Sequence, residues 1–310
     1  MSLLKWLFRR SAGKGRVCLE VRADGIGWSA VLSAPEKQAS FGFLQCTPAG
    51  RREALSQLVT ERDWSGFKAT LVLPLDQYSV FQLERPSELA DTELASALRW
   101  KLKDLLDYSP SDAVCDVFPF PSDASRGRGD LINVVAARKS MASELADLVS
   151  EANLELDRID IAELALRNFA ASLDPQGRGV ALVHLRDRYG QMVVCKGPVL
   201  YLSRRLDVTS DDLRDASRQE NAVQSLALEA QRSLDYFESQ LGQVPPRAIH
   251  LVARDAMLPL SSMLSAYMAP SVEQIDWTQH GLTEPLDSRC LTVWSAGQPL
   301  APAARKGESQ

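Results

Sequence analysis

The sequence predicts an α/β protein that is built twice on one plan. Two stretches, 17–32 and 180–195, each read as strand, tight polar turn and strand, and each stands at the start of one half of the chain. Strands and helices follow both stretches in a similar order, which is typical of α/β folds. The 310 residues correspond to about two domains of roughly 100–200 residues each. A break rich in Gly, Pro and Asp at 174–179 marks the expected boundary.

Hydrophobic periodicity and turn residues define the elements of the first half. The clearest is a helix with Ser87 as N-cap and leucines at helical spacing as far as Leu106, before Pro110 forbids continuation. The other expected elements are helices at 50–63, 140–152 and 162–171, strands at 67–74, 80–84, 113–117, 131–137 and 156–161, and a loop at 119–129.

The second half continues after its hairpin with a long amphipathic helix over about 219–241, which Pro245 and Pro246 end. Further strands are expected at 199–202, 249–253 and 290–293, with a helix at 259–267. The tail from 297 to 310 is expected to be disordered.

Composition excludes several classes of protein. A net charge of -5 and a pI near 5.4 argue against nucleic-acid binding, which leaves a basic footprint. Five scattered cysteines without a C-x-x-C pair argue against a disulfide or zinc framework and favour a reducing compartment. No apolar run approaches the ~18–20 residues of a spanning helix, and no signal-peptide cleavage pattern follows the first residues. We therefore expect a cytoplasmic protein without a metal site.

The first residues form a basic and apolar segment, 1–15. Its side chains suit the interface of a membrane, where rings lie among headgroups and cations meet anionic lipid. The candidates for membrane contact are Trp6, Phe8, Arg9 and Arg10. The alternative is a short helix packed on its own domain, or a frayed terminus.

Three passages point to a known family. They are 74–109 with its "LLDYSP" ending, the helical string 229–237, and the turn 256–259. With the order of elements, these passages resemble the PilM family of actin-like ATPases from type IV pilus assembly, and within it the branch that serves the MSHA (mannose-sensitive haemagglutinin) pilus. The resemblance implies a duplicated actin-like (ribonuclease H-like) fold. Domain 1 would span 16–172 with an inserted subdomain at about 74–118, and domain 2 would span 173–296.

The family's nucleotide site needs glycines and carboxylates that this chain has lost. Its two hairpins have the form strand-Asp-Ile-Gly, in which glycine lets backbone N–H groups approach the phosphates and the acid positions magnesium. Here arginine replaces both glycines, and a histidine replaces the second acid. The resemblance marks these vestigial nucleotide-site positions: Glu20, Arg22, His184, Arg186, Glu229, Arg232, Tyr236, Arg254 and Asp255.

Two alternatives stay open at these positions. Arg22 and Arg186 either pair with nearby Asp24, Asp187 or Glu20, or converge on an anion, since guanidinium matches phosphate geometry. The second concerns three residues one helical turn apart on the long helix: Glu229, Arg232 and Tyr236. Either they contact adenosine, as this helix does in the superfamily that the chain resembles, or they form an ion pair within the helix.

The sequence therefore supports two hypotheses of function. The first is a non-catalytic scaffold at the cytoplasmic face of the inner membrane, which docks the cytoplasmic tail of a PilN-like (MshJ-like) bitopic membrane protein and contacts the pilus assembly ATPase. Its candidate groove residues are Val80, Phe81, Trp100 and Tyr108. Trp100 and Tyr108 are either aromatic anchors of the groove or core residues of the subdomain. The second is an active PilM-like ATPase that binds ATP and magnesium. Walker A and G-x-S-x-G motifs are absent from the sequence.

Overall fold

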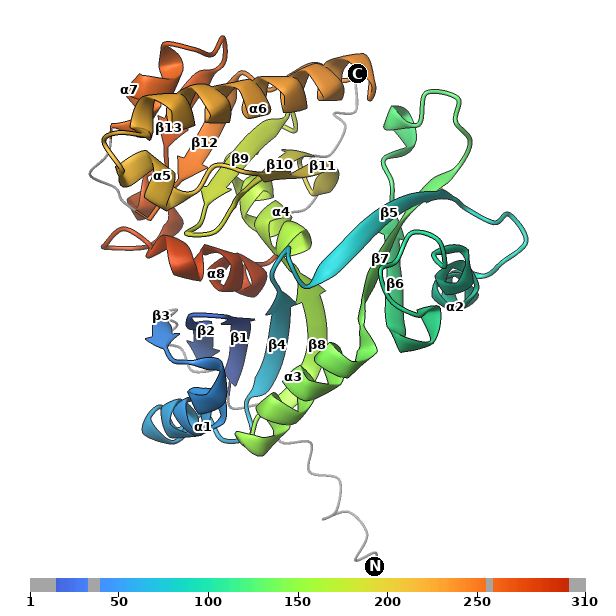
Figure 1. The fold of residues 1–310 in the computed structure, drawn as a ribbon, viewed down its shortest axis with the longest axis vertical. Helices are drawn as coiled ribbons and strands as arrows, with labels where there is room; N and C mark the ends of the chain where they lie inside the picture. Colours follow the sequence, from blue (N-terminus) through green and yellow to red (C-terminus); the bar gives the residue numbers. More distant parts are fainter. Residues whose placement is uncertain (1–14, 33–39, 255–258, 301–310) are drawn as a thin grey trace, which may run out of the picture.

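Two five-stranded sheets with the same topology form the body of the protein. The computed structural model describes residues 15–32, 40–254 and 259–300. The strand orders are β3-β2-β1-β4-β8 and β11-β10-β9-β12-β13, with three antiparallel strands followed by two parallel ones in each sheet. The predicted duplication is confirmed (Figure 1).

The first sheet and its helices match the expected elements closely. Its strands are β1 (Gly15–Arg22), β2 (Gly25–Leu32), β3 (Ser40–Gln45), β4 (Lys68–Leu73) and β8 (Glu155–Ile161), and its helices are α1 (Arg51–Glu61) and α3 (Lys139–Glu151). The second sheet contains β9 (Val180–Leu185), β10 (Gly190–Lys196), β11 (Val199–Leu206), β12 (Ala248–Val252) and β13 (Ser271–Gln274), with α5 (Ser210–Arg214), α6 (Gln219–Ser239) and α7 (Leu260–Ser265). The elements β3, α5 and β13 lie outside every stretch expected from the sequence.

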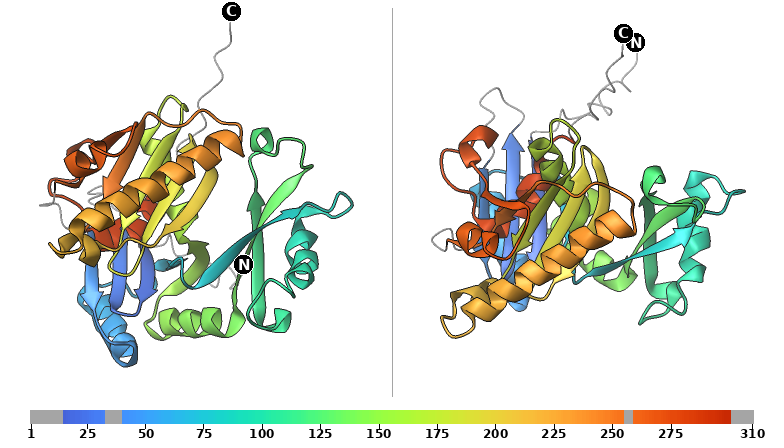
Figure 2. Two further views of the ribbon diagram at one scale, coloured as in Figure 1. Left: turned by 45° about the horizontal axis from the view of Figure 1, so that its top comes forward. Right: turned by 90° about the horizontal axis from the view of Figure 1, so that it is seen from above.

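The central strands of each sheet are buried on both faces, so alternate residues of such a strand enter different cores. On β9, Ala181 and Val183 face α6, whereas Val180 and Leu182 face a core between the two domains. Figure 2 shows α6 lying across the outer face of the second sheet.

Two helices exchange places between the domains. Helix α4 (Ala162–Leu173) ends domain 1 in the sequence but packs on the second sheet, and α8 (Leu291–Gly297) ends domain 2 but packs on β1 and β2. The strand predicted at 290–293 is therefore wrong: a short 3-10 turn precedes α8 there. Residues Leu291–Ala296 are buried on every side, so no helical periodicity is visible in the run.

The inserted subdomain is a three-stranded sheet with one helix. Strand β7 (Leu131–Arg138) lies between β5 (Tyr78–Glu84) and β6 (Ala113–Pro119), and α2 (Asp91–Lys101) covers one face. Because β7 pairs with both neighbours, the subdomain extends beyond residue 118, where the sequence placed its end. Helix α2 begins after Ala90, not Ser87, and ends well before Leu106.

The loop between β6 and β7 fastens this subdomain to domain 2. Phe120 and Ala124 are buried in the core beneath α6, and the Tyr201 hydroxyl donates to both carboxylate oxygens of Asp123 at 2.9 Å. Arg126 donates to the backbone oxygen of Ser239 at the end of α6. We call this contact the clasp. It joins the two domains at a second place besides the α4–α8 crossing.

Candidate functional site at the domain cleft

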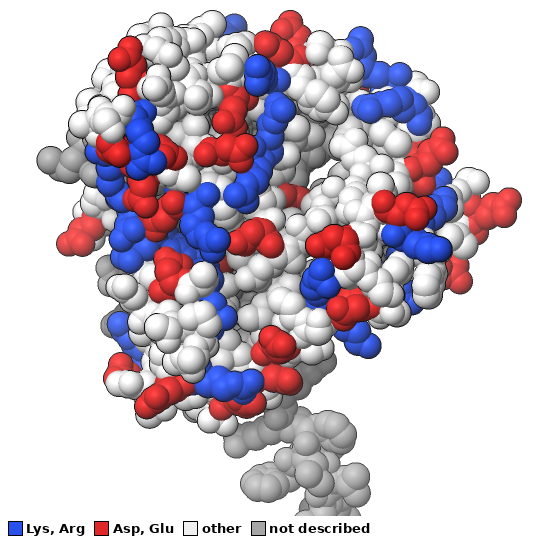
Figure 3. Space-filling model, in the orientation of Figure 1, with Lys and Arg blue, Asp and Glu red and all other residues white. Residues whose placement is uncertain are grey.

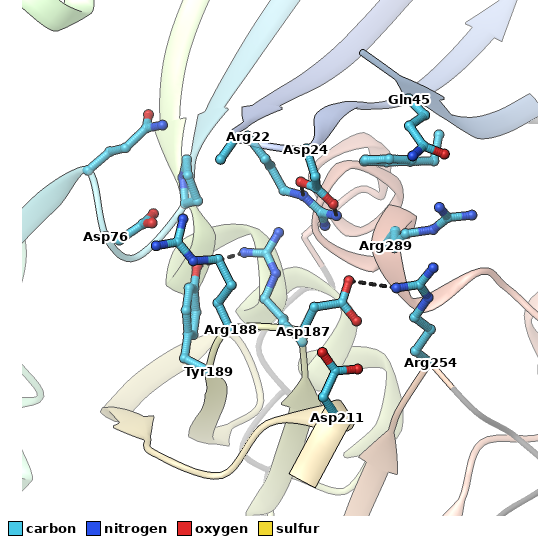
Figure 4. A pocket seen from close by; sticks show the side chains of 15 residues that line it. Arg22, Asp24, Gln45, Asp76, Asp187, Arg188, Tyr189, Asp211, Arg254 and Arg289 are labelled. Atoms are coloured by element: carbon cyan, nitrogen blue, oxygen red, sulfur yellow. Dashed lines mark hydrogen bonds and ion pairs between the residues drawn. The ribbon is translucent and has the colours of Figure 1, made fainter. Parts of the chain in front are cut away.

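A cavity of ≈ 360 Å³ opens between the two domains where both hairpins turn (Figure 4). Arginines and aspartates dominate its charged lining, which comes from both sheets. The lining residues are Arg22, Ala23, Asp24, Phe43, Gln45, Pro74, Asp76, Gln77, Arg186, Asp187, Arg188, Tyr189, Asp211, Arg254 and Arg289. The cleft thus contains three of the vestigial positions and five arginines.

Strand alternation brings the paired positions of the two hairpins together. Cys18 of β1 and Leu182 of β9 both face the interdomain core. Side chains two and four positions further along a strand point to the same side. Glu20 and Arg22 therefore point to the same side as Cys18, and His184 and Arg186 to the same side as Leu182. The four vestigial residues therefore approach one another across the domain boundary.

Both hairpin arginines converge on Glu20. Arg186 Nη2 donates to Glu20 Oε2 and its Nη1 donates to the Tyr189 hydroxyl at 2.9 Å. Arg22 Nη1 lies 3.9 Å from the same Glu20 oxygen. The Glu20 side chain is fully buried and that of Arg186 is 6% exposed. Burial alone would lower the pKa of Arg186, but the charge of Glu20 raises it above the ordinary value.

Arg22 forms its main ion pair with Asp24, as one of the two alternatives expected. Its Nε and Nη2 donate to the two Asp24 carboxylate oxygens at 3.1 and 2.8 Å. Burial would raise the pKa of Asp24, but this bidentate bond from Arg22 lowers it below the usual value. The guanidinium of Arg22 also lies over the ring of Phe43, 4.6 Å from its centroid.

His184 is a neutral core residue. It is 1% exposed, and its Nε2 lies 2.8 Å from the backbone oxygen of Ser288. Burial, with the nearby charge of Arg186, lowers the pKa of His184 to about 3. A neutral imidazole in this place supplies no carboxylate for a hydrated magnesium ion.

The far wall of the cleft is closed by a further ion pair. Arg254 Nη1 donates to Asp187 Oδ2 at 2.8 Å (Figure 4). Arg289 lies on the same side of the cleft (Figure 4); it makes a bidentate bond with Asp287, and its guanidinium is 4.4 Å from the Phe43 ring centroid. Asp255, the neighbour of Arg254 in the sequence, lies outside the described residues.

The charged groups at the two hairpin turns are engaged with one another. Guanidinium groups stand where the resemblance would place glycines, His184 stands where it would place the second acid, and Glu20 is held by Arg186. In the described part of the chain, Arg188 is the cleft arginine for which no hydrogen bond or ion pair to a carboxylate is found. Sequence reasoning missed Phe43 and Arg289, because β3 was not expected and 290–293 was taken as a strand.

Helix α6 does not contribute to the cleft. Glu229 accepts a hydrogen bond from the backbone N–H of Asp207 at 3.1 Å, and no ion pair with Arg232 is found in the described chain. Tyr236 lines a second cavity, on the side of domain 2 that faces the inserted subdomain. Of the two alternatives for these residues, the intrahelical ion pair is not found in the described chain, and none of the three residues lines the cleft.

The four groove candidates lie on different surfaces. Val80 lines the second cavity, and Phe81 packs towards α2 on the opposite face of β5. Trp100 is 59% exposed on α2. Tyr108 lines a third cavity, of ≈ 450 Å³, where the subdomain meets domain 1. Of the two aromatic candidates, Tyr108 therefore lines a cavity, whereas Trp100 is an exposed surface residue.

The membrane-contact candidates Trp6, Phe8, Arg9 and Arg10 lie outside the described residues. Over the ranges 15–32, 40–254 and 259–300, no helix is long and apolar enough to cross a membrane. Over the same ranges, no cluster of three or more His, Cys, Asp and Glu side chains is placed to hold a metal ion.

Comparison with known proteins shows the fold. No protein-family model and no curated protein sequence matches the chain. A PilM–PilN type IV pilus biogenesis complex is similar in structure, with a TM-score of 0.68, 17% identity, and coverage of 91% of this chain and 98% of the other. The cytoplasmic domain of EpsL, an inner-membrane component of the Vibrio cholerae type II secretion system, has a TM-score of 0.55, 16% identity, and coverage of 88% and 97%.

A Bacteroides thetaiotaomicron protein of unknown function with an actin-like ATPase fold also matches, with a TM-score of 0.55, 9% identity, and coverage of 90% and 95%. These neighbours cover about nine-tenths of the chain, and they share its two-domain α/β arrangement. The chain has the actin-like ATPase fold.

Proposed function

We propose that this protein is a non-catalytic scaffold of a type IV pilus assembly machine, of the MSHA type, at the cytoplasmic face of the inner membrane. It docks the cytoplasmic tail of a PilN-like (MshJ-like) bitopic protein, and the pilus assembly ATPase is a further partner. The likeness to a PilM–PilN complex supports the partner class. The observation that carries the proposal is the buried pair between Glu20 and Arg186, which occupies the cleft where the fold would hold phosphates.

The third cavity suits the docking of the tail. It lies between domain 1 and the subdomain, lined by the start of β5, the segment after α2, the end of β7 and the start of α3. Leu105 on its rim is 53% exposed. The ring of Tyr108 is backed by the Arg138 guanidinium, 4.2 Å from its centroid, which holds the aromatic side chain in place. An aromatic anchor beside exposed apolar surface is typical of a peptide-binding groove.

Fluorescence anisotropy with the labelled tail of the neighbouring PilN-like protein tests the docking. We expect saturable binding to the wild type and a loss of at least about tenfold in affinity for Tyr108→Ala, because aromatic anchors dominate interface energy. Trp100→Ala is the matched control, since Trp100 lines none of the cavities described above. Absence of binding by the wild type would overturn the scaffold proposal, and equal losses in both variants would move the site away from the third cavity.

Calorimetric titration with magnesium-ATP tests the loss of the nucleotide site. We expect no binding of micromolar affinity, because Arg186, Arg22 and Arg254 are engaged by carboxylates of the protein itself. The double variant Arg22→Gly/Arg186→Gly restores the glycines of the family but not the second acid, and serves as a comparison. Micromolar binding by the wild type would support the alternative function, an active PilM-like ATPase.

A further inference from the structure

A second cavity, of ≈ 410 Å³, lies between the inserted subdomain and domain 2, away from the domain cleft. Figure 3 shows the surface hollowed between the lobe that carries α2 and the body of domain 2. One wall is the face of the three-stranded sheet that α2 leaves uncovered, with Val80, Gln82, Phe118 and Asn133. The other wall is the segment Leu200–Ser203 of β11, with Tyr236 of α6.

A buried carboxyl group lines this cavity. Glu163, in the first turn of α4, is 3% exposed. The Tyr78 hydroxyl donates to its Oε2 at 3.3 Å, and the Ser203 hydroxyl is its other polar neighbour. Burial raises the pKa of Glu163 to about 7. A carboxyl group in a cavity with a pKa in the physiological range is a candidate binding group.

Glu163 has no cationic partner in the described part of the chain. The helix offers one at the usual i, i+4 spacing, Arg167, but that guanidinium donates to the Asn168 side chain at 3.1 Å. Its charge interacts with Asp160 and Cys195, not with Glu163. The titratable side chains that line the cavity beside Glu163 are all tyrosines: Tyr78 on β5, Tyr201 on β11 and Tyr236 on α6. The carboxyl group is thus open to a positive charge from outside.

The walls suit the same kind of ligand. The tyrosines lie beside the carboxylate, and aromatic rings attract cations. The ring of Tyr201 already has Lys196 Nζ over it, 5.6 Å from its centroid. The apolar edges of the tyrosine rings, with Val80 and Leu202, fit the methylene stem of a long side chain.

Strand β11 supplies a place for a backbone beside the cavity. It ends the second sheet and, within the described residues, pairs with β10 alone. An unpaired strand edge accepts an extended segment through main-chain hydrogen bonds. The clasp holds the end of this wall, because Tyr201 of β11 is bonded to Asp123 of the subdomain. The cavity is therefore preformed.

We propose that this cavity binds a lysine or arginine side chain, which an extended partner segment presents while it lies along β11. The positive charge meets the Glu163 carboxylate, the stem lies between the tyrosines, and the flanking residues pair with the strand edge. This goes beyond the proposed function, because the cavity shares only Tyr78 with the third cavity, which contains Tyr108.

The test uses three acetylated, amidated tripeptides, Val-Lys-Val, Val-Arg-Val and Val-norleucine-Val, with n-butylammonium as the free cation. Binding to the full chain is measured by NMR titration at about pH 6 and about pH 8. The protein variants are Glu163→Gln and the control Glu84→Gln. Glu84 is an exposed carboxylate on the face of β5 that also carries Val80 and Gln82. Circular dichroism and thermal unfolding verify that both variants are folded.

We expect the two cationic peptides to bind at least about tenfold more tightly than the norleucine peptide, as a charge-assisted hydrogen bond predicts. Their affinity should rise from pH 6 to pH 8 as Glu163 loses its proton, and the pH effect should vanish in Glu163→Gln but not in Glu84→Gln. Equal binding of the norleucine and lysine peptides, or an unchanged pH profile in Glu163→Gln, would overturn the proposal. Binding of n-butylammonium as tight as that of the peptides would overturn the role of β11, and no binding of any probe would overturn the site.

Discussion

Glu20 and Arg186 stabilise each other in a place that water does not reach. Each comes from a different domain, and their side chains are 0% and 6% exposed. Glu20→Gln would leave the guanidinium buried without its carboxylate. We expect this change to lower the free energy of unfolding by about 3–5 kcal/mol, as for other broken buried ion pairs.

Urea denaturation checks this value, with Asp24→Asn as the matched control. Asp24 pairs with Arg22 in the same cleft, but its side chain is 50% exposed, so its removal should cost about 0–1 kcal/mol. The double variant Glu20→Gln/Arg186→Met should recover much of the loss, because no unpaired charge stays buried. Similar losses of unfolding free energy in Glu20→Gln and Asp24→Asn would show that the buried pair contributes no more to stability than the exposed one.

Glu163 makes stability depend on pH. Its pKa is raised from 4.5 to about 7 by burial, so the folded chain holds this proton more tightly than the unfolded chain. Between these values the folded state binds more protons, and its stability falls as pH rises, then levels off above about pH 7. Relative to Glu163→Gln, the wild type should lose up to roughly 3 kcal/mol across this window. Unfolding curves at about pH 5 and about pH 8 measure it, and a constant difference between the two proteins would contradict it.

At the scale of elements, the sequence predicts what depends on neighbours in the chain. The hairpin strands, α1, α3 and α6 are read from local periodicity and turn residues, and the structure confirms them. The end of the subdomain is not local, because β7 belongs to it only through pairing with β5 and β6. The sequence places 131–137 as a strand but contains no sign of its partners.

Helix α8 shows a second limit. Leu291–Ala296 is buried on all sides because it lies at the crossing with α4, packed near Phe169 and Trp277. A run that is apolar on every face has no period, and a short one reads equally as a strand. The partners of the cleft arginines also depend on contacts between distant parts of the chain. The sequence identifies Arg22 and Arg186 as unusual, but only the fold brings both to Glu20.

At the scale of the whole molecule, the clasp adds to the contacts that the two domains make at the α4–α8 crossing and at the Glu20–Arg186 pair. The α4–α8 crossing lies beneath the cleft, and the clasp joins the subdomain to domain 2 at the far side of the second cavity. An attachment that lies outside the cleft restricts its opening.

Phe120→Ala tests the clasp. Phe120 is 6% exposed in the core beneath α6, so its truncation should lower the free energy of unfolding by about 3–5 kcal/mol. The loss should be accompanied by faster hydrogen exchange in the β6–β7 loop and in β11, because Asp123 would no longer be held against Tyr201. Trp100→Ala removes a larger aromatic side chain from the same subdomain, but from an exposed site, and should change stability by less than about 0.5 kcal/mol. Unchanged exchange in β11 of Phe120→Ala would show that the subdomain does not restrain domain 2.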